Sequence, residues 1–120
     1  MSLDRGIPHV SWKFYSPDCL FSSSILNSLQ WSVKGIPNNP FNEAIFIKPE
    51  KTGPLPLIIY PHGGPHSNFS NEFFLQAAVF ASLGFAVALL NYTGSTGYGE
   101  SCIKKLIGNI GSFDVRDCHV

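Results

Sequence analysis

The N-terminal third of the chain is rich in Ser, Pro and Asn, contains no long apolar run, and alternates between apolar and polar residues in two short stretches. Apolar side chains recur at every second position at Trp12 and Phe14, and again at Leu29, Trp31 and Val33. A period of two places successive side chains on opposite faces of a strand. The pattern therefore predicts one or two strands of the antiparallel type in this part of the chain.

The hydrophobic pattern becomes denser after the first 42 residues. Apolar residues 44–47 predict a short strand between the turn-rich segments 35–40 and 48–54. The run Leu57–Tyr60 is apolar without interruption and lies between two prolines. Such a run is typical of a strand that is covered on both faces in a largely parallel sheet.

An uncharged stretch follows at 73–90. Its first half has apolar residues at helical spacing, with Ser70 or Asn71 as the expected N-cap and Gly84 at the expected end. Residues 85–90 then predict a second buried strand. The pattern changes at the glycine, and the stretch is barely long enough to span a bilayer. A helix followed by a strand is therefore favoured over a membrane span.

Strand, glycine loop, helix and strand form a βαβ unit, whose two strands are expected to lie parallel in one sheet. Residues 91–99 predict another glycine-rich loop, and residues 114–117 predict the first turn of a helix with acids at its positive end. The sequence thus predicts an α/β fold, with a mostly parallel sheet and flanking helices, preceded by a short β-rich segment.

Composition and charge narrow the class of protein. With 44% hydrophobic and 13% charged residues, the 120-residue chain is of the globular type. Eight scattered basic residues balance eight acidic ones, so we expect neither nucleic acid nor a membrane as partner. The sequence contains three cysteines, Cys19, Cys102 and Cys118, and their spacing is typical neither of a disulfide framework nor of a zinc site. This favours a protein that resides in a reducing environment. Because no apolar leader pattern is visible either, we expect a cytoplasmic location.

The pentapeptide His62-Gly63-Gly64-Pro65-His66 directly follows the first buried strand, where open α/β folds build their sites. Two adjacent glycines allow backbone N–H groups to point into a cleft, an arrangement that stabilises the oxyanion in acyl transfer. The alternative is a tight turn that needs glycine only for its backbone conformation. The Gly-Gly-Pro spacer prevents the helix that would align the histidines as metal ligands, so no metal is expected. His62 is interpreted as a loop anchor that bonds the backbone.

Other potential nucleophiles have weaker support. The nucleophilic serine of α/β-hydrolases lies in a Gly-x-Ser-x-Gly turn, a pattern that does not occur in the 120 residues. Ser95 lies in a Gly-Ser-Thr-Gly sequence without that spacing and is interpreted as a loop hydroxyl. Cys102 and Cys118 have no recognisable basic partner and are expected to be buried or bystander thiols.

Two further groups of side chains have mainly structural interpretations. Asp114, Asp117 and His119 are too close in sequence to be an orienting acid and its base, so solvated or capping roles are expected. Phe69 is a candidate for lining a substrate pocket. Core packing is expected for three other phenylalanines: Phe73, Phe74 and Phe85.

Three blocks make the pattern specific: LPLIIYPHGGPH, then GFAVALLNYTGSTGYGES after an apolar helix, then IGNIGSFDVRDC. They resemble the hydrolase domain of the acylaminoacyl-peptidases, in the prolyl oligopeptidase family. The blocks cover Leu55 to about Cys118, and the earlier IPHVSWKFYS is similar to the stretch that leaves that family's β-propeller. The resemblance implies an incomplete α/β-hydrolase fold, with residues 1–42 as a β-rich linking segment. Residues 43–120 would be the N-terminal part of the hydrolase domain, truncated before the catalytic serine, aspartate and histidine.

The resemblance also implies an activity and a site. It assigns one N–H of the oxyanion hole to Gly64 and places His62, Gly63, Pro65 and His66 near the substrate. The implied parent is a homo-oligomeric serine exopeptidase that releases N-acylated amino acids from peptides through an acyl-enzyme, without metal or cofactor. The 120-residue chain alone is then expected to be inactive.

One residue departs from the family pattern, and two other hypotheses remain open. The family's loop reads NYRGSTG, whereas this chain has Thr93 in place of the arginine, so a charge contact would be lost or replaced. The first alternative is a non-catalytic binding module that pairs its open sheet edge with a partner. The second is another α/β-hydrolase, such as an esterase or lipase, which shares the His-Gly-Gly loop. The NYTGSTGYG block favours the oligopeptidase group.

Overall fold

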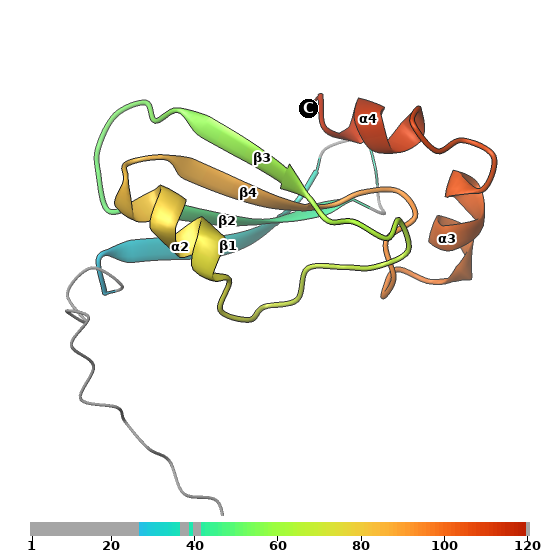
Figure 1. The fold of residues 1–120 in the computed structure, drawn as a ribbon, viewed down its shortest axis with the longest axis horizontal. Coiled ribbons are helices and arrows are strands. Elements are labelled where there is room, and N and C mark those ends of the chain that lie inside the picture. Colours follow the sequence, from blue (N-terminus) through green and yellow to red (C-terminus); the bar gives the residue numbers. More distant parts are fainter. Residues whose placement is uncertain (1–26, 37–38, 40–41, 120) are drawn as a thin grey trace, which may run out of the picture.

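The computed structural model describes residues 27–36, 39 and 42–119. The strand predicted around Trp12 and Phe14, and Cys19, lie outside the described residues. The four described strands form one sheet with the order β1-β2-β4-β3, and helices flank it (Figure 1). In chain order they are β1 (Leu29–Gly35), β2 (Glu43–Pro49), β3 (Leu57–Pro61), α2 (Leu75–Ser82), β4 (Ala86–Asn91), α3 (Glu100–Leu106) and α4 (Phe113–Asp117).

The sheet is mixed rather than mostly parallel. β3 and β4 pair in parallel, as the βαβ pattern predicts, but β2 pairs antiparallel with both β1 and β4. The expected strands at 29–33 and 44–47 are therefore confirmed, and they form a hairpin that joins the same sheet. The mixed topology arises because β2 runs antiparallel to β4, and β1 extends the sheet beyond β2. The division at residue 42 stays a prediction.

The prediction that the Leu57–Tyr60 strand is covered on both faces is wrong. β3 is an edge strand of the described sheet, and 52% of Leu57 and 39% of Ile59 is exposed. These two side chains share one face of the strand, whereas Ile58 and Tyr60 point to the other face. There they pack against the cluster between α2 and the sheet, which consists of Ile45, Ala77, Val87 and Leu89. Only the face toward α2 is covered.

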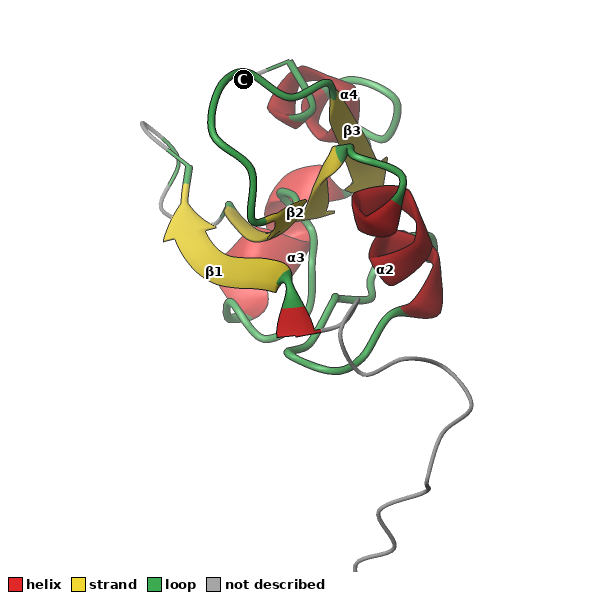
Figure 2. Cartoon of the chain, turned by 90° about the vertical axis from the view of Figure 1, so that its left-hand side faces the viewer, coloured by secondary structure: helices red, strands yellow, loops and turns green. Residues whose placement is uncertain are grey.

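Helix α2 packs along one face of the sheet (Figure 2). Its alanines Ala77 and Ala81 are buried, and their small side chains bring the helix close to Val87 and Leu89 of β4. The predicted helix is thus confirmed, but the expected N-cap at Ser70 or Asn71 is wrong. The helix begins at Leu75, and its N-cap residue is Phe74, which is extended and offers no side-chain cap. No helix of the described residues is long and apolar enough to cross a membrane.

The end of α2 is set by Gly84, as predicted. Gly84 has a φ of 97°, and its N–H donates to the carbonyl of Ala81 at 3.0 Å, while the N–H of Phe85 donates to that of Phe80 at 3.1 Å. This pair of bonds is a Schellman motif, which satisfies the last carbonyls of the helix and turns the chain into β4. Phe85 and Phe74 are half-buried, whereas the expected core packing of Phe73 is wrong, because 68% of it is exposed.

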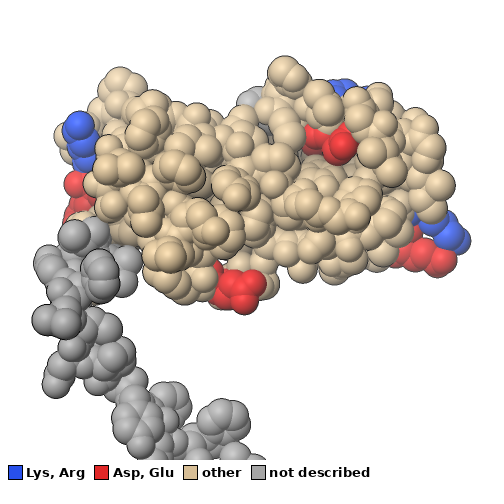
Figure 3. All heavy atoms as spheres, in the orientation of Figure 1, with Lys and Arg blue, Asp and Glu red and all other residues tan. Residues whose placement is uncertain are grey.

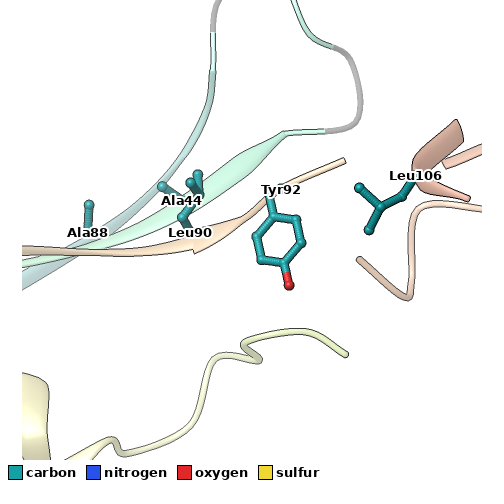
Figure 4. Packing of buried hydrophobic residues seen from close by; sticks show 5 residues of the cluster. All are labelled: Ala44, Ala88, Leu90, Tyr92 and Leu106. Carbon is teal, nitrogen blue, oxygen red and sulfur yellow. The ribbon is translucent and has the colours of Figure 1, made fainter. Parts of the chain in front are cut away.

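A second cluster lies on the face of the sheet opposite α2 and extends past the carboxyl end of β4. Tyr92 projects there beside Leu106 of α3 and joins Ala44, Ala88 and Leu90 (Figure 4). Helices α3 and α4 both lie beyond the carboxyl ends of β3 and β4 (Figure 1). The sequence predicts α4 at residues 114–117, but not α3. In the described part of the molecule, short helices therefore lie next to the carboxyl ends of β3 and β4.

Replacing Gly94 by alanine should destabilise the protein much more than replacing Gly84. Both have a positive φ, but a Cβ at Gly94 would lie 2.7 Å from Cβ of Leu106, whereas a Cβ at Gly84 meets nothing within 4 Å. We expect Gly84→Ala to lower the free energy of unfolding by about 1 kcal/mol. Gly94→Ala should lower it by about 3 kcal/mol or more, because packing must also shift. Urea denaturation measures both values, and equal losses would contradict this account of the junction with α3.

Candidate functional site

Two glycine-rich loops meet at the carboxyl end of the sheet. The first, residues 62–66, follows β3 and is called here the HGGPH loop; the second, residues 92–99, follows β4. Nδ1 of His66 donates to the carbonyl of Gly94 at 2.8 Å, since a carbonyl can only accept. The N–H of Thr96 donates to the carbonyl of Ser67 at 2.8 Å. The structure thus brings together two loops that are some thirty residues apart in sequence.

Tyr92 fixes both ends of the Gly-Gly turn. Its hydroxyl lies 2.9 Å from the carbonyl oxygen of His62 and 3.2 Å from that of Pro65. Its ring stacks on the imidazole of His62, with 4.4 Å between centroids. Burial, with smaller contributions from Asp114 and Cys118, raises the pKa of Tyr92. The phenol therefore keeps the proton that it donates to the two carbonyls. Sequence reasoning missed this role.

His62 is an anchor of the HGGPH loop, as the sequence interpretation has it. Its Nδ1 lies 2.9 Å from the carbonyl oxygen of Gly63, and its Nε2 lies 2.7 Å from Oγ of Ser95. Because the Gly63 carbonyl can only accept, Nδ1 carries the proton and Nε2 of the neutral ring accepts from the Ser95 hydroxyl. Ser95 is completely buried. It is a loop hydroxyl, as predicted.

The two glycines of the HGGPH loop leave their amides available. Within the described residues, the N–H groups of Gly63 and Gly64 donate no hydrogen bond, and both glycines are exposed. Gly64 has a φ of 135°, and a Cβ there would lie 3.0 Å from the backbone N of His66. A side chain at this position would therefore strain the turn. The loop offers backbone donors at the point where α/β folds place their ligands.

Asn91 and Tyr98 support the segment that leads from the HGGPH loop toward α2. The Asn91 side chain accepts from the N–H of Phe69 at 2.7 Å and donates to its carbonyl at 3.0 Å. It also contacts the hydroxyl of Tyr98, which lies 3.0 Å from Oε1 of Glu43. Burial raises the pKa of Tyr98. Phe69 is half-buried against Tyr60 and Phe74, so it belongs to the core beneath α2.

Thr93, the residue that departs from the family pattern, faces α4 and the start of β2. Its N–H donates to Oδ2 of Asp117 at 2.9 Å, and its hydroxyl donates to Oδ1 of Asn42 at 3.3 Å. Nδ2 of Asn39 donates to the same hydroxyl oxygen at 3.1 Å. The expectation of a solvated or helix-capping role is wrong for Asp117, because its carboxylate is buried and satisfies a donor of the neighbouring loop. His119 is exposed.

The two thiols within the described residues, Cys102 and Cys118, do not form a reactive centre. Cys102 is fully buried, and its Sγ accepts from the N–H of Gly94 at 3.2 Å. Burial raises the pKa of Cys118, and Asp114 and Asp117 raise it further. The described residues contain no group of three or more potential metal ligands. The face of the molecule in Figure 3 carries few charged side chains. The chemistry available at the meeting of the loops is therefore that of backbone donors.

Solved structures similar to this one are peptidases. The acylaminoacyl peptidase of Pyrococcus horikoshii superposes with a TM-score of 0.67 at 25% identity, over 81% of this chain and 16% of that chain. A puromycin-hydrolyzing peptidase of Mycobacterium tuberculosis superposes with a TM-score of 0.66 at 29% identity, over 75% and 15%. The fold is thus that of an α/β-type peptidase domain.

Residues 71–120 match the profile of the prolyl oligopeptidase family. The acylamino-acid-releasing enzyme of Sus scrofa is 48% identical over 79 residues, which make up 62% of this chain and 11% of the enzyme. That of Arabidopsis thaliana is 34% identical over an alignment of 132 positions, which covers 94% of this chain and 17% of that enzyme. The resemblance to acylaminoacyl-peptidases is confirmed, and the chain spans 11% and 17% of the length of these two relatives.

Labelling by a thiol reagent should be slow at Cys118 and faster in an Asp114→Asn variant. The thiolate is the reactive form, and a pKa raised by burial and by two carboxylates keeps it scarce below about pH 9. Removing one carboxylate charge lowers the pKa and should raise the labelling rate at pH 8 about twofold or more. Peptide mass spectrometry separates Cys118 from the other two thiols. Glu50→Gln, on an exposed residue outside this cluster, serves as the charge-matched control. An unchanged rate in Asp114→Asn would contradict this origin of the pKa.

Proposed function

We propose that this chain supplies the oxyanion-binding loop of an α/β-hydrolase domain in a serine peptidase of the acylaminoacyl-peptidase type. The parent enzyme would release N-acylated amino acids from peptides. The observation that carries the proposal is the pair of exposed, unpaired amides at Gly63 and Gly64, at the carboxyl end of β3. The relatives' names support the substrate class, since they are acylamino-acid-releasing enzymes.

In acyl transfer, negative charge develops on the carbonyl oxygen of the substrate. Backbone donors that are already in place stabilise this charge, and removing one donor raises the barrier by about 3 to 4 kcal/mol. Gly64 fits this role because its amide is exposed and because its backbone conformation excludes a side chain without strain. The other four residues of the HGGPH loop would shape the substrate's surroundings. A cytoplasmic location and a homo-oligomeric parent remain predictions.

The chain lacks a Gly-x-Ser-x-Gly turn, so the test must supply the nucleophile from a relative. The human acylamino-acid-releasing enzyme is 47% identical over 79 residues. A chimera replaces the matching segment of that enzyme by residues 43–119 of this chain. We expect the chimera to hydrolyse an acylated amino-acid reporter. A folded chimera without turnover would overturn the proposal.

Within that chimera, Gly64→Ala should lower kcat by about a hundredfold or more, because the turn that aims the amide can no longer form. Gly53→Ala is the matched control, since Gly53 also has a positive φ and a Cβ there meets nothing within 4 Å, but it lies in the loop before β3, outside the HGGPH loop. Thermal melts check that both variants fold. Equal kcat values for the two variants would show that Gly64 has no special role.

A further inference from the structure

The direction of the Gly64 amide follows from a chain of hydrogen bonds that starts at Ser95. The peptide unit between Gly63 and Gly64 is planar and trans, so its C=O and N–H point in opposite directions. The carbonyl of Gly63 accepts from Nδ1 of His62 at 2.9 Å. The imidazole therefore draws this carbonyl toward itself and turns the N–H of Gly64 away from itself.

That contact requires one of the two neutral tautomers of His62. A neutral imidazole has one N–H donor and one acceptor nitrogen. If Nε2 carried the proton, Nδ1 would present a lone pair to the carbonyl oxygen of Gly63, and the two would repel. The peptide unit would then be free to rotate, which two adjacent glycines permit. The tautomer of His62 and the direction of the Gly64 amide are thus linked.

Ser95 selects the tautomer. Its Oγ lies 2.7 Å from Nε2 of His62, and no other side-chain partner of this hydroxyl occurs within the described part of the chain. If Nε2 carried the proton, the Ser95 oxygen would accept it, and the O–H of Ser95 would have no acceptor among the described residues. Because Ser95 is completely buried, water cannot take that place, and an unpaired buried donor costs about 1 to 3 kcal/mol. The hydroxyl therefore donates to Nε2, which keeps the proton of His62 on Nδ1.

We propose that Ser95 is a positioning residue, which aims the N–H of Gly64 by fixing the tautomer of His62. This inference rests on the proposed function for its catalytic consequence, but its geometry can be tested without turnover. Tyr92 acts in parallel. It holds the carbonyl of His62, on the other side of Gly63, so both peptide units that flank Gly63 are fixed.

The first test uses the full 120-residue chain with 15N-labelled histidine, at a pH where the imidazole is neutral. Nitrogen chemical shifts distinguish the two tautomers. We expect the Nδ1–H tautomer in the unaltered chain. In Ser95→Ala, the Nε2–H tautomer should become populated and the amide resonance of Gly64 should move. Ser32→Ala, on an exposed residue of β1, is the matched control and should change neither. An Nε2–H tautomer in the unaltered chain, or no response in Ser95→Ala, overturns the inference.

The second test measures the catalytic consequence in the active chimera described above. Ser95→Ala should lower kcat about tenfold to a hundredfold, with little change in KM. The reason is that an amide which points away no longer stabilises the transition state, whereas it contributes little to binding of the substrate in its ground state. An unchanged kcat alongside a shifted tautomer would overturn the positioning role. An inactive parent chimera would overturn the proposed function instead, and the tautomer measurement would then decide the positioning inference alone.

Discussion

The site depends on one constraint: the buried polar groups of five consecutive residues, 91–95, need partners at the point where β4 leaves the sheet. All five are buried. Each buried group without a partner costs about 1 to 3 kcal/mol, more than a satisfied bond contributes. Their partners lie in different segments: the loop before α2, the HGGPH loop, α4 and α3. Satisfying this strand end therefore assembles the surrounding loops and helices in one arrangement.

The side-chain contacts of this strand end fall into two sets, which involve different parts of the molecule. Tyr92 and Ser95 contact the HGGPH loop, whereas Thr93 contacts Asn42 and Asp117. The departure at Thr93 therefore affects the docking of α4, and none of its hydrogen bonds reaches the HGGPH loop. A threonine also suits the place, because its N–H and hydroxyl both find partners without adding a charge. The absence of the arginine is thus compatible with an intact HGGPH loop.

The sequence predicts what local pattern determines. Period-two alternation marks β1, helical spacing marks α2, and a glycine with a positive φ ends that helix. The exposure of β3 could not be predicted in this way, because a continuous apolar run does not reveal which strand lies at the edge of the sheet. Helix α3 escaped notice because its seven residues are mostly polar and bury only Cys102 and Leu106.

The same limit applies to the site. The HGGPH motif identifies the loop because adjacent glycines are a local signal, but its supports are about thirty residues away in sequence. Tyr92 lies at the start of the glycine-rich loop predicted at residues 91–99, and Ser95 lies in the Gly-Ser-Thr-Gly sequence of the same loop. Nothing in either segment reveals a partner in residues 62–66. Such roles follow from tertiary packing, which places the carboxyl ends of the parallel strands β3 and β4 side by side.

The contact between Ser95 and His62 has the distance of a nucleophile and its base, but burial and bonding argue for another role. A nucleophile must reach the substrate, and Ser95 is completely buried. In catalytic pairs a third group orients the base so that it can accept a proton, usually a carboxylate that stabilises the resulting cation. Here the second nitrogen of His62 instead faces a neutral backbone carbonyl. The hydrogen bonds of the pair therefore fix the shape of the Gly-Gly turn, and Ser95 is not placed to act as a nucleophile.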